Sequence, residues 1–359
     1  MAAGVIAGLW LTAVFSLAER YGSLGDFSSF YCGGEILRTR GPSALYDFAA
    51  MQESDARHFP GHDIVMPFLR PPFYALLVAP LSLLPPHRAL LVWLALNAAA
   101  LAGGVFLTAR ATGMELSAAA WHGAIFYPAL FTFFNRQDVP ILLLLAAGGY
   151  LLMKRRRSFA AGLILSLCSI KFHLLLLVPL ALLMRKDRRA LRGLLAGLAV
   201  LALISVLMLG PAGVADYARI LLGRRVPNIV NHPYRVTNLS NLARGTWLRI
   251  PLILLAVGAV IAAARRLAPL PALAAGWLGS LLVAPHIFLS DYLVALPACL
   301  LLARLGRICF FSSLLLLFPV IPVLMAVDER YVVAAPFLTL LVLLGAAVAS
   351  PPTVAPAHD

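Results

Sequence analysis

Charged residues are scarce in this chain of 359 residues, and acidic residues are the scarcest. Only 12% of the residues are charged, with 15 Asp and Glu against 29 Lys and Arg, while 62% are hydrophobic and the mean hydropathy is +0.91. Soluble domains are typically about 25% charged and about 45–50% apolar. The composition therefore excludes an ordinary soluble protein and predicts an all-α, polytopic integral membrane protein.

Cysteine is also scarce, and several sequence signatures are missing. The four cysteines, Cys32, Cys168, Cys299 and Cys309, form no Cys-x-x-Cys pair, and three of them lie in apolar runs. Neither a disulfide framework nor a zinc site is predicted. The sequence has no GxGxxG loop, no Walker A loop and no Asp-x-Asp pair, which argues against a soluble nucleotide-activated substrate and its metal. A serine hydrolase is also unsupported, because there is no GxSxG.

The excess of positive charge comes from clusters at the ends of apolar runs. These are Lys154–Arg157, Arg185–Arg189, Arg265-Arg266 and the pair Arg304 and Arg307. Cytoplasmic loops of membrane proteins are rich in Lys and Arg, so the clusters indicate topology and not nucleic-acid binding. This places residues 210–249, 285–291 and 328–330 outside. In the first half, strict alternation leaves the orientation wrong by one crossing, so one short segment there is re-entrant or is not a span.

The apolar segments predict about 10–12 membrane helices, including short or re-entrant ones. They lie at residues 2–18, 72–84, 89–109, 117–134, 139–153, 158–184, 191–209, 250–264, 271–285, 292–303, 308–327 and 331–349. Residues 2–18 have no basic residue before them and no cleavage site after them, so we interpret them as a retained first span. We expect one domain over residues 1–349 and a disordered tail at 350–359.

Two regions differ from simple spans. Ser158–Met184 is too long for one span and has Lys171 and His173 at its middle, which predicts two short helices that meet at a polar tip. In the first outer loop, residues 19–70, apolar side chains from Phe27 to Leu37 share one helical face, and Gly41-Pro42 follows. We expect that helix to lie along the membrane surface.

The same first outer loop holds the most informative acidic residue. Seven of the 15 Asp and Glu lie between Glu19 and Arg70, and Asp26 comes soon after the predicted first span. A carboxylate at the lipid–water boundary can accept a proton from an attacking hydroxyl, which is general-base catalysis. The alternative is that Asp26 is a solvated acid or caps the helix that begins near Ser28.

Polar residues interrupt the apolar part of the chain at three places. These are Lys171 with His173, the run Asn135-Arg136-Gln137-Asp138, and Pro285-His286 with Asp291. Ionisable residues inside a membrane are costly, so by default they indicate function, and the three sites together predict a shared polar cavity. The alternative is that each is a helix end at the interface. Asp138 and Asp291 would then pair with Arg136 or Lys171 in a purely structural role.

The second outer loop, residues 210–249, is rich in arginine. It carries six arginines against the single acid Asp216, namely Arg219, Arg224, Arg225, Arg235, Arg244 and Arg249. Guanidinium groups match phosphate in charge and geometry, which predicts contact with phosphate or anionic lipid. The alternative is that long loops escape the positive-inside rule.

The order of several short motifs resembles glycosyltransferase family 87, the membrane mannosyltransferases of the GT-C class. The motifs are Gly25–Tyr31, Gly41–Asp47, Arg70-Pro71-Pro72, Ala79–Pro85, Arg136–Val139, Lys171-Phe172-His173 and Thr237–Ser240. The resemblance covers most of the chain and is weakest after Arg304. Two positions differ from the family pattern: its Gly-Gln reads Arg136-Gln137, and its Lys-x-x-Pro reads Lys171-Phe172-His173-Leu174.

This resemblance implies a GT-C-type fold and an inverting transfer of a hexose, commonly mannose. The donor would be a polyprenyl monophosphate, and the acceptor a lipid or glycan on the extracytoplasmic side of the inner or plasma membrane. Asp26 would be the catalytic base. The donor phosphate and substrate would be bound by residues drawn from Arg70, Arg136, Gln137, Lys171, His173, Arg235, Asn238, His286 and Asp291. We expect no cofactor or metal, no nucleic acid partner, contact with membrane lipids and a monomer.

Two other functions remain possible from the residues. A lipid or sugar transporter, or flippase, would also place charges inside the membrane, but such proteins tend to show internal repeats, and none is visible here. A membrane scaffold without catalysis would tolerate replacement of Asp26 and Lys171.

Overall fold

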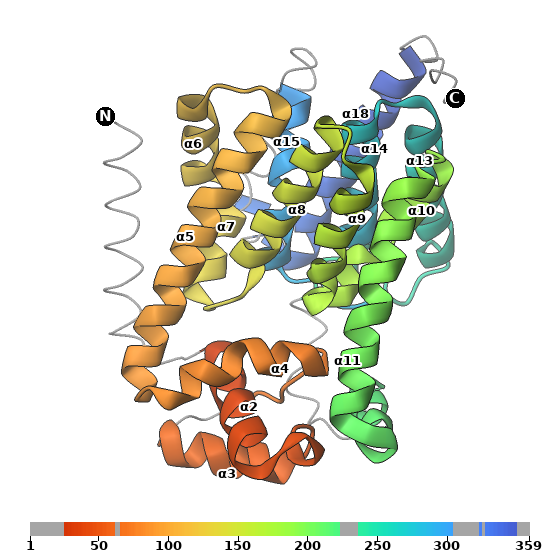
Figure 1. Ribbon diagram of the computed structural model, residues 1–359. Helices are drawn as coiled ribbons and strands as arrows, with labels where there is room; N and C mark the ends of the chain where they lie inside the picture. Colours follow the sequence, from red (N-terminus) through yellow and green to blue (C-terminus); the bar gives the residue numbers. More distant parts are fainter. Residues whose placement is uncertain (1–24, 62–64, 223–235, 304–322, 325–326, 350–359) are drawn as a thin grey trace.

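The computed structural model describes residues 25–61, 65–222, 236–303, 323–324 and 327–349. Within these residues every regular element is a helix. A bundle of longer helices makes up most of the molecule, and a smaller helical layer lies at one end of it (Figure 1). We call this smaller layer the cap. It consists of α2 (Phe27–Arg40), η1 (Pro42–Ala44), α3 (Phe48–His58), α4 (Pro72–Val78) and η2 (Ala79–Leu83).

The bundle begins at α5 and ends at α18. Its elements are α5 (Pro86–Thr112), α6 (Leu116–Ile125), α7 (Tyr127–Phe134), α8 (Val139–Lys154), α9 (Ser158–Ser166), η3 (Leu167–Leu175), α10 (Val178–Met184), α11 (Arg188–Leu221), α12 (Leu239–Leu242), α13 (Arg249–Arg266), α14 (Pro269–Val283), η6 (Leu289–Ala295), α15 (Leu296–Ala303), η8 (Glu329–Val333) and α18 (Ala334–Ala349).

Three helical segments of the described chain are long and apolar enough to cross a membrane. They are Pro86–Thr112, Ser158–Leu175 and Arg188–Leu221, and five shorter apolar helices accompany them. The predicted all-α membrane class is therefore confirmed. The predicted first span at residues 2–18, most of the segment at 308–327 and the tail at 350–359 lie outside the described residues.

The predicted pair of short helices with a polar tip is present between α9 and α10. The helical path runs through η3 and is interrupted at Lys171, whose φ of −118° and ψ of 73° are not helical. The two ends of this helical hairpin lie side by side. The Ser158 hydroxyl, at the start of α9, donates a 3.0 Å hydrogen bond to the Asp187 carboxylate, just after α10. The hairpin therefore enters and leaves the bundle at the same end.

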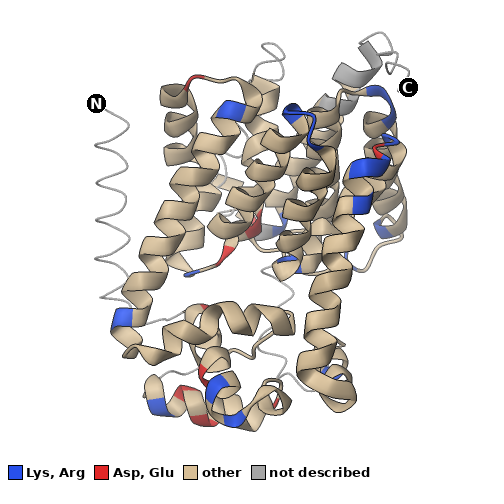
Figure 2. Ribbon diagram, viewed as in Figure 1, with Lys and Arg blue, Asp and Glu red and all other residues tan. Residues whose placement is uncertain are grey.

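The segment Pro72–Leu84 belongs to the cap, where α4 and η2 pack on α2 (Figure 1). The Tyr31 hydroxyl donates a hydrogen bond of 2.9 Å to the carbonyl of Leu84. This segment therefore lies in the cap and not in the bundle. Within the described chain, the basic clusters Lys154–Arg157, Arg185–Arg189 and Arg265-Arg266 stand at helix ends away from the cap (Figure 2). The contact between Lys154 Nζ and the Arg110 carbonyl, 2.7 Å, joins two of these helix ends directly.

Two helices, α5 and α11, extend from the bundle to the cap (Figure 1). α11 has 34 residues and bends at Gly210, which has a φ of +64° and is followed by Pro211. Beyond the bend, Tyr217 packs on Tyr46 of the cap, with the ring centroids 4.7 Å apart. Residues 211–221, in the first part of the predicted second outer loop, thus belong to α11.

The cap is held to the bundle by aromatic packing and has a polar centre of its own. Trp93 of α5 lies 5.3 Å from Phe30 of α2 between ring centroids. Within the cap, buried Glu35 receives hydrogen bonds from Ser54 and Arg57 and pairs with His58 at 3.0 Å. Burial alone would raise the pKa of Glu35, but His58, Ser54 and Arg57 outweigh it and hold this pKa below its usual value.

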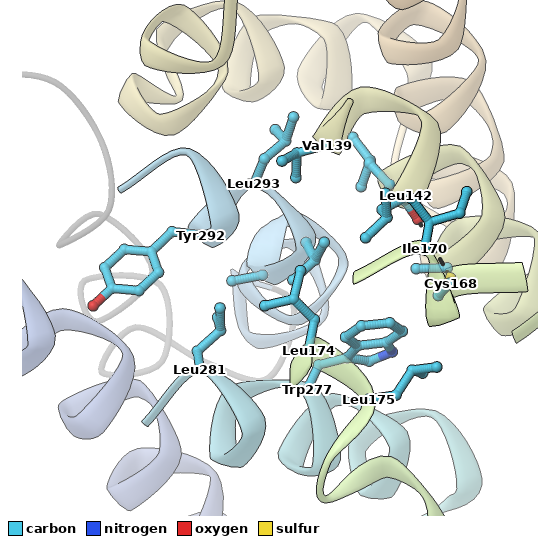
Figure 3. Close-up of a cluster of buried hydrophobic side chains, with 14 of the residues drawn as sticks. Val139, Leu142, Cys168, Ile170, Leu174, Leu175, Trp277, Leu281, Tyr292 and Leu293 are labelled. Atoms are coloured by element: carbon cyan, nitrogen blue, oxygen red, sulfur yellow. Dashed lines mark hydrogen bonds between the residues drawn. The ribbon is translucent and has the colours of Figure 1, made fainter. Parts of the chain in front are cut away.

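The bundle core lies where η3, α8, α14 and η6 meet (Figure 3). Trp277 of α14 and Leu142 of α8 are fully buried there, beside Ile170 and Leu174 of η3. Because Ile170 and Leu174 flank Lys171 in the sequence, packing of their side chains fixes the backbone that carries the lysine. This apolar core thus supports a polar group at its edge.

Candidate active site

A pocket lies between the cap and the nearest ends of the bundle helices. It encloses about 500 Å³, including space open to solvent at its mouth. It is lined by Asp26, Ser29, Phe30, Met66, Pro67, Leu69, Arg70, Gln137, Lys171, His173, His286, Phe288 and Asp291. All three predicted polar islands contribute to this lining, so the expected shared polar cavity is present, with the first outer loop as its other wall.

Asp26 stands at the N-terminus of α2 and faces the bundle. Its side chain makes no capping hydrogen bond to α2, so the structure does not support the alternative of a helix cap. Instead Asp26 Oδ2 accepts a 2.7 Å hydrogen bond from Gln137 Nε2, and the Asp26 backbone N–H donates to the Asn135 carbonyl at 3.2 Å. About 24% of the Asp26 side chain is exposed, so a substrate can reach it.

The surroundings of Asp26 raise its pKa. Burial favours the neutral carboxyl and is the largest effect, while the positive charges of Arg70 and Lys171 oppose it. The net result is a pKa above the usual value of an aspartate. Such a carboxylate binds a proton more readily than a free one, which suits a general base.

Arg70 connects the cap to the start of α8. Its Nε and Nη2 donate to Asp138 Oδ2 and Oδ1 at 2.7 and 2.9 Å, a bidentate pair. The same Nη2 is 3.7 Å from Asp26 Oδ2, and the guanidinium lies 5.2 Å from the centroid of the Phe30 ring. Asp138 is fully buried and holds Arg70 in place. The alternative from the sequence, in which Asp138 pairs with Arg136 or Lys171, is met in part, since Lys171 lies 3.8 Å from Asp138 Oδ1. The bidentate partner of Asp138 is Arg70, from a segment 68 residues earlier.

Lys171 is the second cation of the site. Its Nζ donates to Asp291 Oδ1 at 2.6 Å and to Gln137 Oε1 at 2.8 Å, and it lies 3.8 Å from Asp138 Oδ1. Asp291 in turn accepts from the Phe288 backbone N–H at 2.9 Å, which fixes its carboxylate at the start of η6. The suggested pairing of Asp291 with Lys171 is thus present, inside the pocket lining.

A tight turn between α7 and α8 presents Gln137 to the pocket. The Gln137 backbone N–H donates to the Thr132 carbonyl at 3.0 Å, and Arg136 in the middle of this turn has a φ of +52°. Glycine adopts this left-handed conformation without strain, so the turn is compatible with the glycine that the family resemblance implies at the position of Arg136. The Arg136 carbonyl accepts a 2.9 Å hydrogen bond from Trp93 Nε1, which secures the turn to α5.

Two histidines lie on the wall formed by the hairpin and the loop after α14. The rings of His173 and His286 are 6.1 Å apart between centroids and nearly perpendicular. Phe288 packs against His286 with centroids 4.6 Å apart. The loop that carries His286 is tied down by Asn238, whose amide donates to the Ala284 carbonyl at 2.7 Å.

Not every predicted site residue reaches the pocket. Asp26, Arg70, Gln137, Lys171, His173, His286 and Asp291 all line it. Arg136 and Asn238 are not in the lining; Asn238 instead shapes the loop behind His286. Arg235, like most of the Arg-rich loop, lies outside the described residues. The apolar wall of Met66, Pro67 and Phe288 carries no motif, so sequence reasoning missed it.

Basic and acidic residues are distributed differently between the two ends of the molecule. The ends of the bundle helices far from the cap carry many Lys and Arg and few acids, whereas the cap carries acidic and basic residues together (Figure 2). In the described part of the site, three carboxylates, Asp26, Asp138 and Asp291, surround two basic side chains, Arg70 and Lys171. The pocket therefore combines a partly exposed carboxylate with basic side chains held by buried acids.

The model of glycosyltransferase family 87 matches residues 68–297, which is more than half of the chain. The matched range contains Arg70, Gln137, Lys171, His286 and Asp291, while Asp26 precedes it. Neither the curated proteins nor the solved structures include a match.

Proposed function

Because the chain belongs to glycosyltransferase family 87, we propose that it is a GT-C-type membrane enzyme that transfers a hexose, namely mannose, from a polyprenyl monophosphate. The acceptor is a hydroxyl of a lipid or glycan. The observation that carries the proposal is the meeting of Asp26 with Lys171 and Arg70 in one pocket. A hydroxyl-bearing acceptor and an anionic donor need those two kinds of group side by side.

The chemistry follows from the positions of these groups. The acceptor oxygen forms a bond to the anomeric carbon while the bond from that carbon to the phosphate oxygen breaks, and its electron pair stays with the phosphate. The acceptor proton passes to the Asp26 carboxylate. Attack opposite to the leaving phosphate inverts the anomeric carbon, through an oxocarbenium-like state. Since the leaving group is already an acidic phosphate, one carboxylate suffices.

Positive charge around the pocket stabilises the departing phosphate. Lys171 and Arg70 are held by buried acids in fixed positions, and preorganised charge of this kind lowers the barrier more than mobile charge does. His286 contributes a further hydrogen-bonding group in the same wall. We propose that these residues supply the electrostatic stabilisation without a metal, so that EDTA leaves the transfer rate unchanged.

The charge distribution supports a pocket that opens on the extracytoplasmic side of the cell membrane. The basic helix ends lie away from the cap, and basic ends face the cytoplasm in most membrane proteins. The cap and its pocket then face the other side. We propose that the enzyme acts there as a monomer, with membrane lipids around the bundle.

The test replaces the proposed base. In proteoliposomes with labelled mannosyl polyprenyl phosphate and an acceptor lipid extract, Asp26→Asn should lower product formation by about 10²–10⁴-fold and keep donor binding. Asp47→Asn is the matched control, because Asp47 is exposed and caps α3 through an oxygen that Asn also provides. Wild-type rates in Asp26→Asn would refute the role of Asp26, and transport of lipid or sugar without a covalent product would identify a transporter instead.

A further inference from the structure

The side chain of Gln137 forms hydrogen bonds with both Asp26 and Lys171 in the pocket. Its amide nitrogen donates to Asp26 Oδ2 at 2.7 Å, and its amide oxygen accepts from Lys171 Nζ at 2.8 Å. The side chain is nearly buried, so neither contact is exchanged freely with water. Gln137 therefore links the Asp26 carboxylate directly to the Lys171 ammonium.

The two cations determine which way the amide points. Lys171 Nζ and, more distantly at 3.5 Å, Arg70 Nη2 both direct N–H groups at Gln137 Oε1. A flipped amide would place its own N–H groups against these donors and its oxygen against the Asp26 carboxylate, so every contact would be lost. The nitrogen must therefore face Asp26.

The contacts also distinguish the two oxygens of Asp26. Gln137 and Arg70 both approach Oδ2. Among the contacts within the described residues, this leaves Oδ1 as the oxygen available to an acceptor hydroxyl. A carboxylate held by one oxygen in this way presents the other at a fixed angle, which is what proton transfer from a bound hydroxyl requires.

We propose that Gln137 is a positioning residue that holds Asp26 ionised and oriented for proton acceptance, with its own amide fixed by Lys171. This inference rests on the proposed function, since it assumes that Asp26 is the base. It assigns Gln137 to the acceptor side of the reaction and not to binding of the donor phosphate. Donor affinity should consequently depend little on the Gln137 nitrogen, whereas turnover and its pH dependence should depend on it strongly.

The decisive variant is Gln137→Glu, which has nearly the same shape. It keeps an oxygen for Lys171 but places a second carboxylate oxygen where the nitrogen met Asp26. Two carboxylates at that distance share one proton, so Asp26 is protonated at a higher pH than in the wild type. We expect the acid limb of the kcat–pH profile to move up by about one unit or more, so that kcat falls by up to about tenfold at pH values below the wild-type limb and recovers at higher pH. The KM for the donor should change less than twofold.

Gln52→Glu is the matched control, because Gln52 is the only other glutamine of the chain and is exposed on α3. It should leave the profile unchanged. Gln137→Leu removes the donor without adding charge, and it should lower kcat with a smaller shift of the acid limb. If Gln137→Leu does not fold, the near-isosteric Glu variant still decides the question.

The outcomes separate this inference from the proposed function. If the wild type makes no product from the polyprenyl-phosphate donor, the proposed function fails. If the wild type is active and Asp26→Asn is inactive, but Gln137→Glu keeps the wild-type acid limb, only the role of Gln137 is overturned. A large rise in donor KM at unchanged kcat would also overturn it and assign Gln137 to donor binding.

Discussion

Removing Lys171 should destabilise the protein much more than removing Lys171 together with Asp291. The two side chains are 3% and 1% exposed, and they are joined at 2.6 Å. In Lys171→Met, Asp291 stays buried without its cation, and Asp138 loses a nearby positive charge as well. In the double variant Lys171→Met/Asp291→Leu, both charges leave together and apolar side chains of similar size replace them.

The magnitude follows from what is left unpaired. Breaking a buried ion pair by removing one partner costs about 3–5 kcal/mol, whereas replacing both partners by apolar groups is often nearly neutral. We therefore expect Lys171→Met to lower the melting temperature by about 6–10 °C, at about 2 °C per kcal/mol. The double variant should recover at least about half of that loss.

Thermal unfolding in detergent, followed for the wild type, both single variants and the double variant, measures this coupling. Arg219→Met is the control, because the Arg219–Asp216 pair has the same 2.6 Å separation but its side chains are 48% and 26% exposed. Exposed pairs contribute about 0–1 kcal/mol, so this variant should shift the melting temperature by at most about 2 °C. Strictly additive losses in the double variant would refute the reasoning, because they would mean that the two buried charges do not depend on each other.

Three further predictions concern the cap and its acids. Gly25→Ala should lower the transfer rate about tenfold or more, because Gly25 has a φ of +50° and an added Cβ would overlap the Asn135 carbonyl that holds Asp26. Gly61→Ala, at a φ of +82° with no described residue near its Cβ, carries the same backbone penalty without the overlap, so equal rates in the two variants would contradict this. The raised pKa of Asp26 predicts that kcat/KM is lost as the pH falls through a midpoint above 3.8, the unperturbed value, and full activity at pH 4 would oppose an ionised Asp26 as base. The lowered pKa of Glu35 predicts stability that is fully present above the unfolded-state value of about 4.3 and is lost as the pH falls through the folded-state pKa. The melting temperatures of the wild type and Glu35→Gln should therefore converge on acidification, and a constant gap from pH 7 to pH 3.5 would argue against the pairing.

Features of the fold that depend on local sequence were predictable. The end of α2 at Gly41 and the interruption at Lys171 both follow from residue types near the break. The placement of Pro72–Leu84 was not predictable from composition, because an apolar segment packed in the cap and an apolar segment in lipid have the same residues. The two environments differ in what covers the segment. Here α2 covers it, and this contact cannot be inferred from the residues of the segment alone.

The site shows the same division. The polar islands could be found because ionisable residues stand out in an apolar sequence. The pairing of Asp291 with Lys171 could also be suggested. The pairing of Arg70 with Asp138 could not, since these residues are 68 positions apart and meet only through the docking of the cap. Asn238 looked like a ligand by motif, yet its contact with Ala284 shows a support for the loop of His286.

The shortness of α8 has a consequence for the surrounding bilayer. With 16 residues, α8 spans about 24 Å between the basic end of the bundle and the turn of Gln137, while the hydrocarbon layer of a typical membrane is about 30 Å thick. The chemistry would then take place several ångströms beneath the plane of the headgroups. The acyl chain length of the lipids should therefore affect turnover. In a thinner membrane, the phosphate of an isoprenoid donor lies level with the pocket. In a thicker membrane, that phosphate must move into the hydrocarbon layer to reach the pocket.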